Sequence, residues 1–187
     1  MKMKKSYIII IAILLIIIQA IVLLFIGQLW ICECKYIKFW EGDISSSGSS
    51  QHIADWYTFS HIIHGLVFYG ILWLIFPKMP IHYRFLLALG MEVSWEIFEN
   101  TPLVINAYRQ QALAQGYIGD SILNSVFDTL FTLLGFGFAM LMPVWTSFVF
   151  VIAIEVFVAY SIHDNLTLNI INFIYQFEFI RLWQTGG

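Results

Sequence analysis

An almost unbroken apolar run near the N-terminus constrains this chain more than any other feature. Residues 7–29 are nearly all Ile, Leu and Val, and they follow Lys2, Lys4 and Lys5. At a rise of ~1.5 Å per residue, a helix of this length exceeds the ~30 Å hydrocarbon core of a bilayer. A cleaved signal peptide also begins with basic residues, but its apolar stretch is usually about 7–15 residues long, and no small-x-small cleavage site follows here. The run therefore predicts an uncleaved membrane anchor.

The composition extends this conclusion to the whole chain. Hydrophobic residues make up 60% of the 187 residues and charged residues only 11%, whereas soluble domains contain about 45–50% and about 25%. These values exclude a disordered chain, a nucleic-acid-binding tail, a secreted disulfide scaffold and most cytosolic enzymes. We expect an integral membrane protein whose residues 1–187 form one transmembrane domain.

Four further apolar segments predict an all-α, polytopic membrane helix bundle. Prolines or polar residues separate the segments, and between the first two lies a polar loop, residues 31–55, whose serine-rich stretch 45–50 is typical of a flexible linker. Together with the anchor, the predicted spans cover about residues 7–29, 56–76, 81–100, 118–142 and 144–160.

The C-terminal tail has a different pattern. In residues 165–183, four amide side chains recur at the spacing of one helix face, namely Asn165, Asn169, Asn172 and Gln176. A polar stripe on an otherwise apolar helix favours an amphipathic helix in the membrane interface over a sixth span. The sequence therefore predicts five transmembrane helices, or six if this tail crosses the membrane.

The positions of Lys and Arg in the short loops predict the orientation. With a cytoplasmic N-terminus, the cytoplasmic side carries five of these residues (Lys2, Lys4, Lys5, Lys78 and Arg84) and the outer side carries four (Lys35, Lys38, Arg109 and Arg181). The basic cluster beside the anchor decides between the two orientations, and it favours a cytoplasmic N-terminus.

Ionisable side chains recur inside the predicted spans, although each costs about 2.5–3.5 kcal/mol at the bilayer centre. At about 100° per residue, the three glutamates of the third span fall within about 60° of one face, and the polar residues of the fourth span fall within about 80°. Two histidines lie one turn apart on the second span. The resulting candidate site residues are His61, His64, Glu92, Glu96, Glu99, Asp120, Asn124 and Asp128.

The depths of these residues predict one shared site. Because successive spans alternate in direction, the histidines, glutamates and aspartates all fall in the same half of the membrane, as does Glu155 of the fifth span. We expect a water-accessible cavity that opens to the extracytoplasmic side, with Asp55 and Arg109 at its mouth.

Each component also has a purely structural interpretation. The two histidines are compatible with hydrogen-bonded helix residues, Asp120 with an N-cap and Asn124 with an interhelical hydrogen bond. Five glycines of the spans favour close helix packing over function, namely Gly65, Gly70, Gly90, Gly135 and Gly137. Cys32 and Cys34 are too few for a disulfide framework or a four-ligand zinc site.

Four strings carry a family resemblance. They are His61-Ile-Ile-His64-Gly65, Glu92-Val-Ser-Trp-Glu96-Ile-Phe-Glu99-Asn100, Tyr117-Ile-Gly-Asp120-Ser121-Ile-Leu-Asn124-Ser125-Val-Phe-Asp128 and Asp164-Asn165-Leu-Thr-Leu-Asn169. Over roughly residues 50–170, the chain resembles an uncharacterised UPF/DUF-type family of small bacterial multi-pass inner-membrane proteins. More distantly, it is similar to the VanZ-like membrane proteins, which are associated with teicoplanin resistance and envelope phenotypes. The resemblance implies a bacterial inner-membrane location but no reaction.

Three classes of function fit these residues. The first is an envelope enzyme, a hydrolase or transferase that acts on a lipid or lipid-linked substrate with one divalent metal ion. Its expected ligands are His61, His64, Glu92, Glu96, Asp120 and Asp128, since histidine with carboxylates suits zinc, manganese or iron. Without a metal, His64 or Glu96 would be the general base.

The second class is a proton-coupled or ion-binding transporter, because buried acids and histidines also form proton relays. The third is a non-catalytic assembly or structural protein whose polar cluster holds helices together. The acids of the cluster outnumber the cationic side chains that could pair with them, of which Arg109 is nearly the only one. This excess of acids favours metal or proton chemistry over a structural role. The expected surroundings are the lipid bilayer and no nucleic acid, and the oligomeric state stays open.

Overall fold

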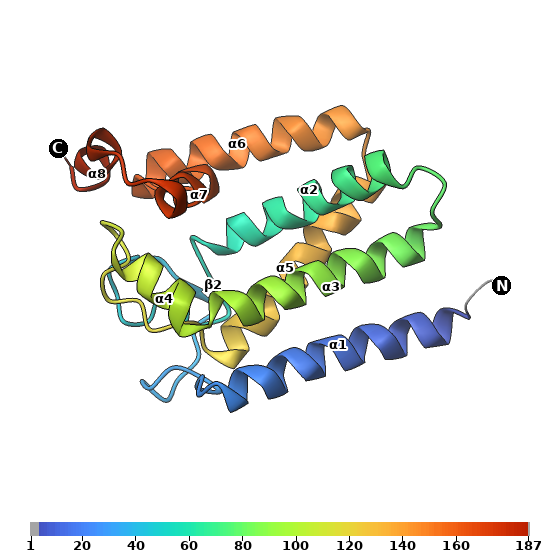
Figure 1. The fold of residues 1–187 in the computed structure, drawn as a ribbon, viewed down its shortest axis with the longest axis horizontal. Helices are drawn as coiled ribbons and strands as arrows, with labels where there is room; N and C mark the ends of the chain where they lie inside the picture. The colour runs from blue at the N-terminus through green and yellow to red at the C-terminus, as the bar shows by residue number, and fades with distance from the viewer. Residues whose placement is uncertain (1–3, 187) are drawn as a thin grey trace.

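The computed structural model describes residues 4–186, which form eight helices and two short strands. In chain order the elements are α1 (Lys5–Phe25), β1 (Trp40–Glu41), β2 (Ala54–Asp55), α2 (Thr58–Ile75), α3 (Ile81–Glu99), α4 (Pro102–Arg109), α5 (Ile122–Leu141), α6 (Val144–Ile162), α7 (Leu166–Ile174) and α8 (Glu178–Gln184). Helices α1, α2, α3 and α6 lie roughly along the long axis of the molecule, α5 runs obliquely across them, and the short helices cluster at one end (Figure 1). The strands pair in parallel, with Trp40 opposite Ala54.

Four helices, α1, α2, α5 and α6, are long and apolar enough to cross a membrane. Their 18 to 21 residues span about 27–32 Å at ~1.5 Å per residue, close to the thickness of a hydrocarbon core. Helix α3 has the length, but Arg84 and its three glutamates give it more charge than these four helices carry. The mostly helical architecture is as predicted, and the apolar helices are compatible with a membrane location, whereas the five-span topology stays a prediction.

Helix α5 is the centre of the bundle, since it contacts α1, α2, α3 and α6. Its closest neighbour is α2, and two glycines permit that contact. A Cβ added to Gly65 of α2 would lie 2.0 Å from the carbonyl oxygen of Thr132, and one added to Gly135 of α5 would lie 2.2 Å from that of Ile62. These two glycines confirm the expected packing role. Gly70, Gly90 and Gly137 do not, because each faces open space.

Residues 45–50 are not the flexible linker that their composition predicted. Ser50 is held from both sides, because its N–H donates to Asp55 Oδ2 at 2.7 Å and its carbonyl oxygen accepts from the Ser121 N–H at 3.0 Å. The first backbone N–H groups of a helix have no partner within it, and at α5 those of Ile122 and Leu123 donate to the carbonyl oxygens of Leu29 and Trp30 at 2.7 and 3.1 Å. Ser121 caps the helix by accepting from the Asn124 N–H. The serine stretch is therefore fixed to the start of α5 through Ser50.

The tail is two short helices, not the single helix predicted over residues 165–183. The chain is extended at Tyr175, where α7 ends, and α8 then begins at Glu178. Asn172 and Gln184 explain the break, since their side chains hydrogen-bond to each other across the turn at 3.4 Å while both are buried. With nine and seven residues, neither helix is long enough to span a bilayer.

The glycine contact generates a stability prediction. Gly65→Ala and Gly135→Ala each place a methyl group inside backbone atoms of the facing helix, so we expect each to lower the free energy of unfolding by about 1–3 kcal/mol or more. Gly70→Ala and Gly137→Ala are the matched controls, and they should be neutral or slightly stabilising because alanine favours helix. Thermal unfolding of the four variants in detergent measures this difference. Equal losses of stability in the two helix-contact variants and the two controls would contradict the prediction.

Candidate polar site

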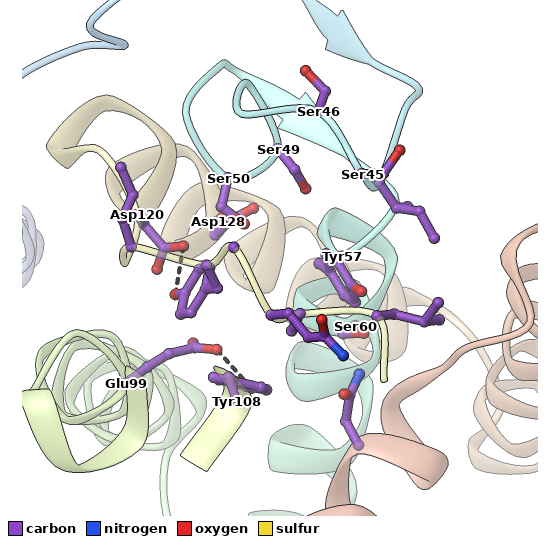
Figure 2. A pocket seen from close by; sticks show the side chains of 18 of the residues that line it. Ser45, Ser46, Ser49, Ser50, Tyr57, Ser60, Glu99, Tyr108, Asp120 and Asp128 are labelled. Carbon is purple, nitrogen blue, oxygen red and sulfur yellow. Dashed lines mark hydrogen bonds between the residues drawn. The ribbon is translucent and has the colours of Figure 1, made fainter. Parts of the chain in front are cut away.

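A cavity of ≈ 460 Å³ lies at the end of the bundle where α2 and α5 begin and α3 ends. In Figure 2 the serine loop, with Ser45, Ser46, Ser49 and Ser50, lies on one side of the cavity, and Glu99 and Tyr108 lie on the other. Tyr57, Ser60 and both candidate histidines of α2 also line it. The cavity is thus enclosed by six parts of the chain, namely the serine loop, the start of α2, the end of α3, residues 108–120, α5 and α7.

Glu92 is the group on which the two histidines converge. The Nδ1 atom of His61 lies 2.7 Å from Glu92 Oε1, and the Nδ1 atom of His64 lies 3.1 Å from Glu92 Oε2. The Thr132 hydroxyl of α5 lies 2.7 Å from Oε1 as well. Glu92 is fully buried, so it lies beneath the cavity floor and fixes both imidazole rings. With Nδ1 engaged on each ring, Nε2 is the nitrogen left for other partners.

Glu96 and Asp128 lie on either side of the His61 ring. Glu96 Oε1 is 3.2 Å from His61 Nδ1, and Asp128 Oδ2 is 3.9 Å from His61 Nε2, which is too far for a hydrogen bond. The other oxygen of Glu96 accepts from the Ser125 hydroxyl at 2.6 Å. Glu96 Oε1 is buried without a hydrogen bond, because His61 Nδ1 carries at most one hydrogen and directs it at Glu92.

Glu99 and Asp120 form a second layer nearer the loops. Glu99 accepts a hydrogen bond from Tyr108 at 2.8 Å, and its other oxygen is buried without a partner. Asp120 accepts from Asn100 Nδ2 and from the Tyr117 hydroxyl, both at 2.8 Å, and Figure 2 shows it at the cavity wall. Both oxygens of Asp120 are therefore engaged. The proposed N-cap role of Asp120 is wrong, because Ser121 caps α5.

The remaining predicted residues lie around this cluster. Asn124 donates to the carbonyl oxygen of His52 at 3.0 Å and so fastens the loop. Asp55 accepts from the N–H groups of Ser50 and Tyr57, and burial raises its pKa.

Two residues expected near the site point elsewhere. Arg109 donates to the carbonyl oxygen of Tyr117 and is exposed. Glu155 accepts from the Leu166 and Thr167 N–H groups, so it satisfies the start of α7. Cys32 and Cys34 are joined by a disulfide bond.

One buried polar residue of α1 is not among the residues predicted from the sequence. Gln19 is fully buried, and its amide donates to the Ser125 hydroxyl at 2.8 Å while its carbonyl oxygen accepts from Thr129 at 2.9 Å. It thereby connects the anchor helix to the residue that supports Glu96. Its isolation among apolar residues was the available signal, since a polar residue in a spanning helix usually has a partner.

The basic groups beside the carboxylates are the imidazoles of His61 and His64, and no Lys or Arg among residues 4–186 pairs with these carboxylates. Within residues 4–186, the ion pairs of Lys and Arg are Lys38–Glu41 and Arg181–Glu178, both outside this cluster. Ligand atoms of His61, His64 and Glu92, and likewise of His61, Glu96 and Glu99, lie within 4.8 Å of one another, close enough to hold a metal ion. A buried carboxylate requires compensation, so protons, water or a cation must provide it here.

Comparisons with known proteins place this chain in a family. Residues 23–186 match the family model described as "Protein of unknown function (DUF2585)". The chain belongs to this family. A UPF0314 protein of Sinorhizobium fredii is 50% identical over 86% of this chain and 81% of its own length, and one of Paracoccus denitrificans is 46% identical over 92% and 90%. No solved structure matches significantly.

The relatives test the resemblance to a UPF/DUF-type family and not the one to VanZ-like proteins. A UPF0314 protein of Sphingopyxis alaskensis is 46% identical over 90% of this chain and 89% of its own length. The predicted UPF/DUF-type family of bacterial proteins is therefore confirmed. The similarity to VanZ-like proteins stays a prediction.

The Gln19 contacts generate a second prediction. Gln19→Leu keeps a similar volume but leaves buried groups of Ser125 and Thr129 without a partner, which should lower the free energy of unfolding by about 1–3 kcal/mol. Gln28→Leu is the control, because Gln28 makes a single 3.4 Å hydrogen bond and is half-buried. Chemical unfolding in detergent compares the two. A loss in Gln28→Leu as large as that in Gln19→Leu would contradict the role of Gln19.

Asp164 generates a prediction about pH. This carboxyl group lies between α6 and α7, where it contacts Tyr57 OH at 3.1 Å and Gln184 Nε2 at 3.0 Å, and burial raises its pKa to about 6. The folded chain therefore binds the proton more tightly than the unfolded chain. Its contribution to stability is present at low pH and falls as the pH rises from about 4 to about 6.

The variant Asp164→Asn should remove this pH-dependent contribution to stability, because an amide does not titrate in this range. The stability of the wild type relative to the variant should fall by up to about 3 kcal/mol between pH 4 and pH 7, given 1.36 kcal/mol per pKa unit. Unfolding free energies across this range measure the difference, and Glu33→Gln, at an exposed carboxylate, is the control. A difference that does not change with pH would overturn the prediction.

Proposed function

We propose that this protein is a membrane-embedded hydrolase or transferase that uses one divalent metal ion to act on a lipid or lipid-linked envelope substrate. One observation carries the proposal. Two histidines of α2 are oriented by a single buried carboxylate, Glu92, at the floor of a cavity whose other carboxylates have no Lys or Arg partner among residues 4–186.

The imidazole arrangement supports metal binding. Histidines that bind metals usually donate their second ring N–H to a carboxylate, which fixes the tautomer and the ring orientation. His61 and His64 both direct Nδ1 at Glu92, which leaves Nε2 of each as a candidate ligand atom. Glu92 then serves as the orienting group and not as a ligand, which departs from the ligand set that the sequence suggested.

The ligand set that fits these contacts is smaller than the six residues expected. His61, His64 and Asp128 line the cavity, Asp128 Oδ2 lies 3.9 Å from His61 Nε2, and Glu96 is adjacent to His61. Asp120 is less suited, because Asn100 and Tyr117 occupy both its oxygens. Nitrogen and oxygen donors of this kind suit zinc, manganese or iron. Such an ion would polarise a phosphoryl or acyl group and lower the pKa of bound water.

The residues also offer acid–base chemistry of their own. An imidazole whose Nδ1 donates to a carboxylate is held in one tautomer, with Nε2 as the acceptor. Either histidine could therefore take a proton from a nucleophile in the cavity through Nε2. Glu96 Oε1 has no hydrogen bond, which makes Glu96 the second candidate for a general base.

The location of the site supports chemistry at a membrane surface. We propose that α1, α2, α3, α5 and α6 cross the bacterial inner membrane with a cytoplasmic N-terminus, so that the cavity faces the extracytoplasmic side. Helix α3 tolerates its glutamates in this arrangement because Glu92 and Glu96 are fully buried against α2 and α5. A lipid headgroup on that side would reach the cavity without crossing the hydrocarbon core.

The packing favours an enzyme over a transporter. Beyond Glu92, toward the other end of the bundle, Leu72, Ala88 and Phe136 form a buried apolar core with aromatic neighbours. A proton or ion pathway requires polar groups or water along its length, and this core interrupts it. A purely structural role for the cluster is also less favoured, because Glu96 and Glu99 each retain a buried oxygen without a hydrogen bond.

Metal analysis tests the proposal. We expect detergent-purified protein to bind close to one zinc, manganese or iron ion per chain, and His61→Ala, His64→Ala and Asp128→Asn each to lose most of it. Glu92→Gln should weaken binding by roughly 10–100-fold, as is usual when the group that orients a ligand is lost. Elemental analysis and competition with a chelator measure both effects.

Asp164→Asn is the matched control, since Asp164 is equally buried but bonds to the C-terminal helices. It should retain the metal. The wild type and the variants would then be assayed on phospholipids and lipid-linked phosphates. A wild type that binds none of these ions, even when each is added, would eliminate the metal-dependent mechanism and leave the histidines as acid–base groups.

A further inference from the structure

A second cavity of ≈ 800 Å³ lies on the side of the bundle, between α2, α3 and α7. Its walls are almost wholly apolar, with Phe68 of α2, Leu87, Met91 and Phe98 of α3, and Ile170 and Phe173 of α7. Leu87, Phe98 and Ile170 are exposed, so this groove opens to the outer surface of the bundle. At the proposed depth of α3, that surface faces lipid.

The groove and the polar cavity adjoin each other. Five residues line both, namely His64, Trp95, Tyr108, Leu166 and Asn169. His64 is the decisive member, because its ring also contacts Glu92 at the cavity floor and stacks on Phe68 of the groove, with ring centroids 5.6 Å apart. A molecule that occupies both spaces would therefore place its polar–apolar junction beside His64.

We infer that the groove binds the hydrocarbon chain of a lipid whose head group lies in the polar cavity, and that the lipid enters sideways from the bilayer between α3 and α7. The inference rests on the proposed function and names its substrate class as an amphiphile with at least one long acyl or prenyl chain. The two spaces match the two halves of such a molecule, one with carboxylates and imidazoles, the other with apolar side chains.

A lipid chain fits the groove better than a peptide does. A bound peptide needs partners for its backbone hydrogen-bonding groups, since unsatisfied groups are costly in an apolar setting. The groove walls are helices whose own backbone groups are bonded within the helix, and the Ser94 hydroxyl is already bonded to the carbonyl oxygen of Gly90. A hydrocarbon chain has no hydrogen-bonding groups, and the side chains of the groove supply apolar contact along its length.

Gly90 provides a way to fill the groove. It lines the cavity, and a Cβ added there meets no atom within 4 Å. Gly90→Phe therefore places a ring in the groove without a backbone clash, and Gly90→Leu is a smaller second variant. Gly137→Phe and Gly137→Leu are the matched controls, because Gly137 has equally open surroundings and a similar exposure but lines neither cavity. All four replace glycine by a better helix former.

The probe is phosphatidylglycerol that carries a diazirine midway along one acyl chain, mixed into phosphatidylglycerol–phosphatidylethanolamine vesicles that contain the full-length protein. After illumination, mass spectrometry of peptides locates the label. We expect Met91 and Phe173 to be labelled severalfold more than Val149 and Val156, which are exposed on α6 and report ordinary lipid contact. Gly90→Phe should reduce the groove labelling severalfold and leave the α6 labelling unchanged, with a smaller reduction in Gly90→Leu.

Labelling of the groove no greater than that of α6, or equal in the Gly90 and Gly137 variants, would overturn the inference. Groove labelling that falls as the protein density in the vesicles rises, while the α6 labelling stays constant, would assign the groove to a second copy of the chain and would also overturn the inference. Metal content measured on the same samples separates the two proposals. Selective labelling without metal would leave a lipid-binding groove and reject the metalloenzyme, whereas metal without selective labelling would do the reverse.

Discussion

Direct backbone contact between α2 and α5 is the constraint on which the polar site depends. The absence of a Cβ at Gly65 and Gly135 lets the two helices approach until side-chain atoms would collide with carbonyl oxygens. One turn from these glycines, that approach brings the Thr132 hydroxyl within 2.9 Å of the His61 carbonyl oxygen and 2.7 Å of Glu92. The position of the imidazole rings relative to the carboxylates of α3 therefore follows from the spacing of two main chains. A wider separation would remove the Thr132 contact and leave Glu92 with less support.

The charge balance of the cluster sets what it can do. A buried acid costs several kcal/mol unless it is paired, protonated or bound to a cation, and no Lys or Arg among residues 4–186 pairs with the acids of this cluster. Hydroxyl and amide donors offset part of this cost at Asp120 through Asn100 and Tyr117. Glu96 and Glu99 keep one oxygen each without a donor. A helix bundle that needed only polar contacts between helices would be more stable with hydroxyl groups in their place, which is why we propose that a proton or a metal ion binds there.

Much of the bundle could be predicted from sequence because apolar run length and proline positions are local signals. The predicted limits of the long helices fall within a few residues of those observed, and the angular positions of the glutamates put Glu92 and Glu96 on one buried face. Contacts that depend on tertiary structure could not be predicted. Nothing in a serine-rich stretch reveals that the Ser50 carbonyl oxygen accepts from Ser121 at the start of α5. Nor does the stripe of amides in the tail reveal that Asn172 and Gln184 hydrogen-bond across a break between two helices. Gln19 was visible as the exception in an apolar run, but its partner Ser125 lies 106 positions away.

The asymmetry of the bundle explains why its groups suit chemistry on an amphiphile. The polar residues gather where α2 and α5 begin, an apolar core around Phe136 closes the other end, and the open direction is sideways, into a groove lined by apolar side chains. A water-soluble substrate would leave the apolar groove empty. The apolar core around Phe136 would block the path of a transported ion. A lipid satisfies both spaces at once, because its chain stays in an apolar environment while its head moves only as far as His64. The movement of such a lipid into the site would then expose no additional hydrocarbon to water, since the chain passes from the bilayer to an apolar groove.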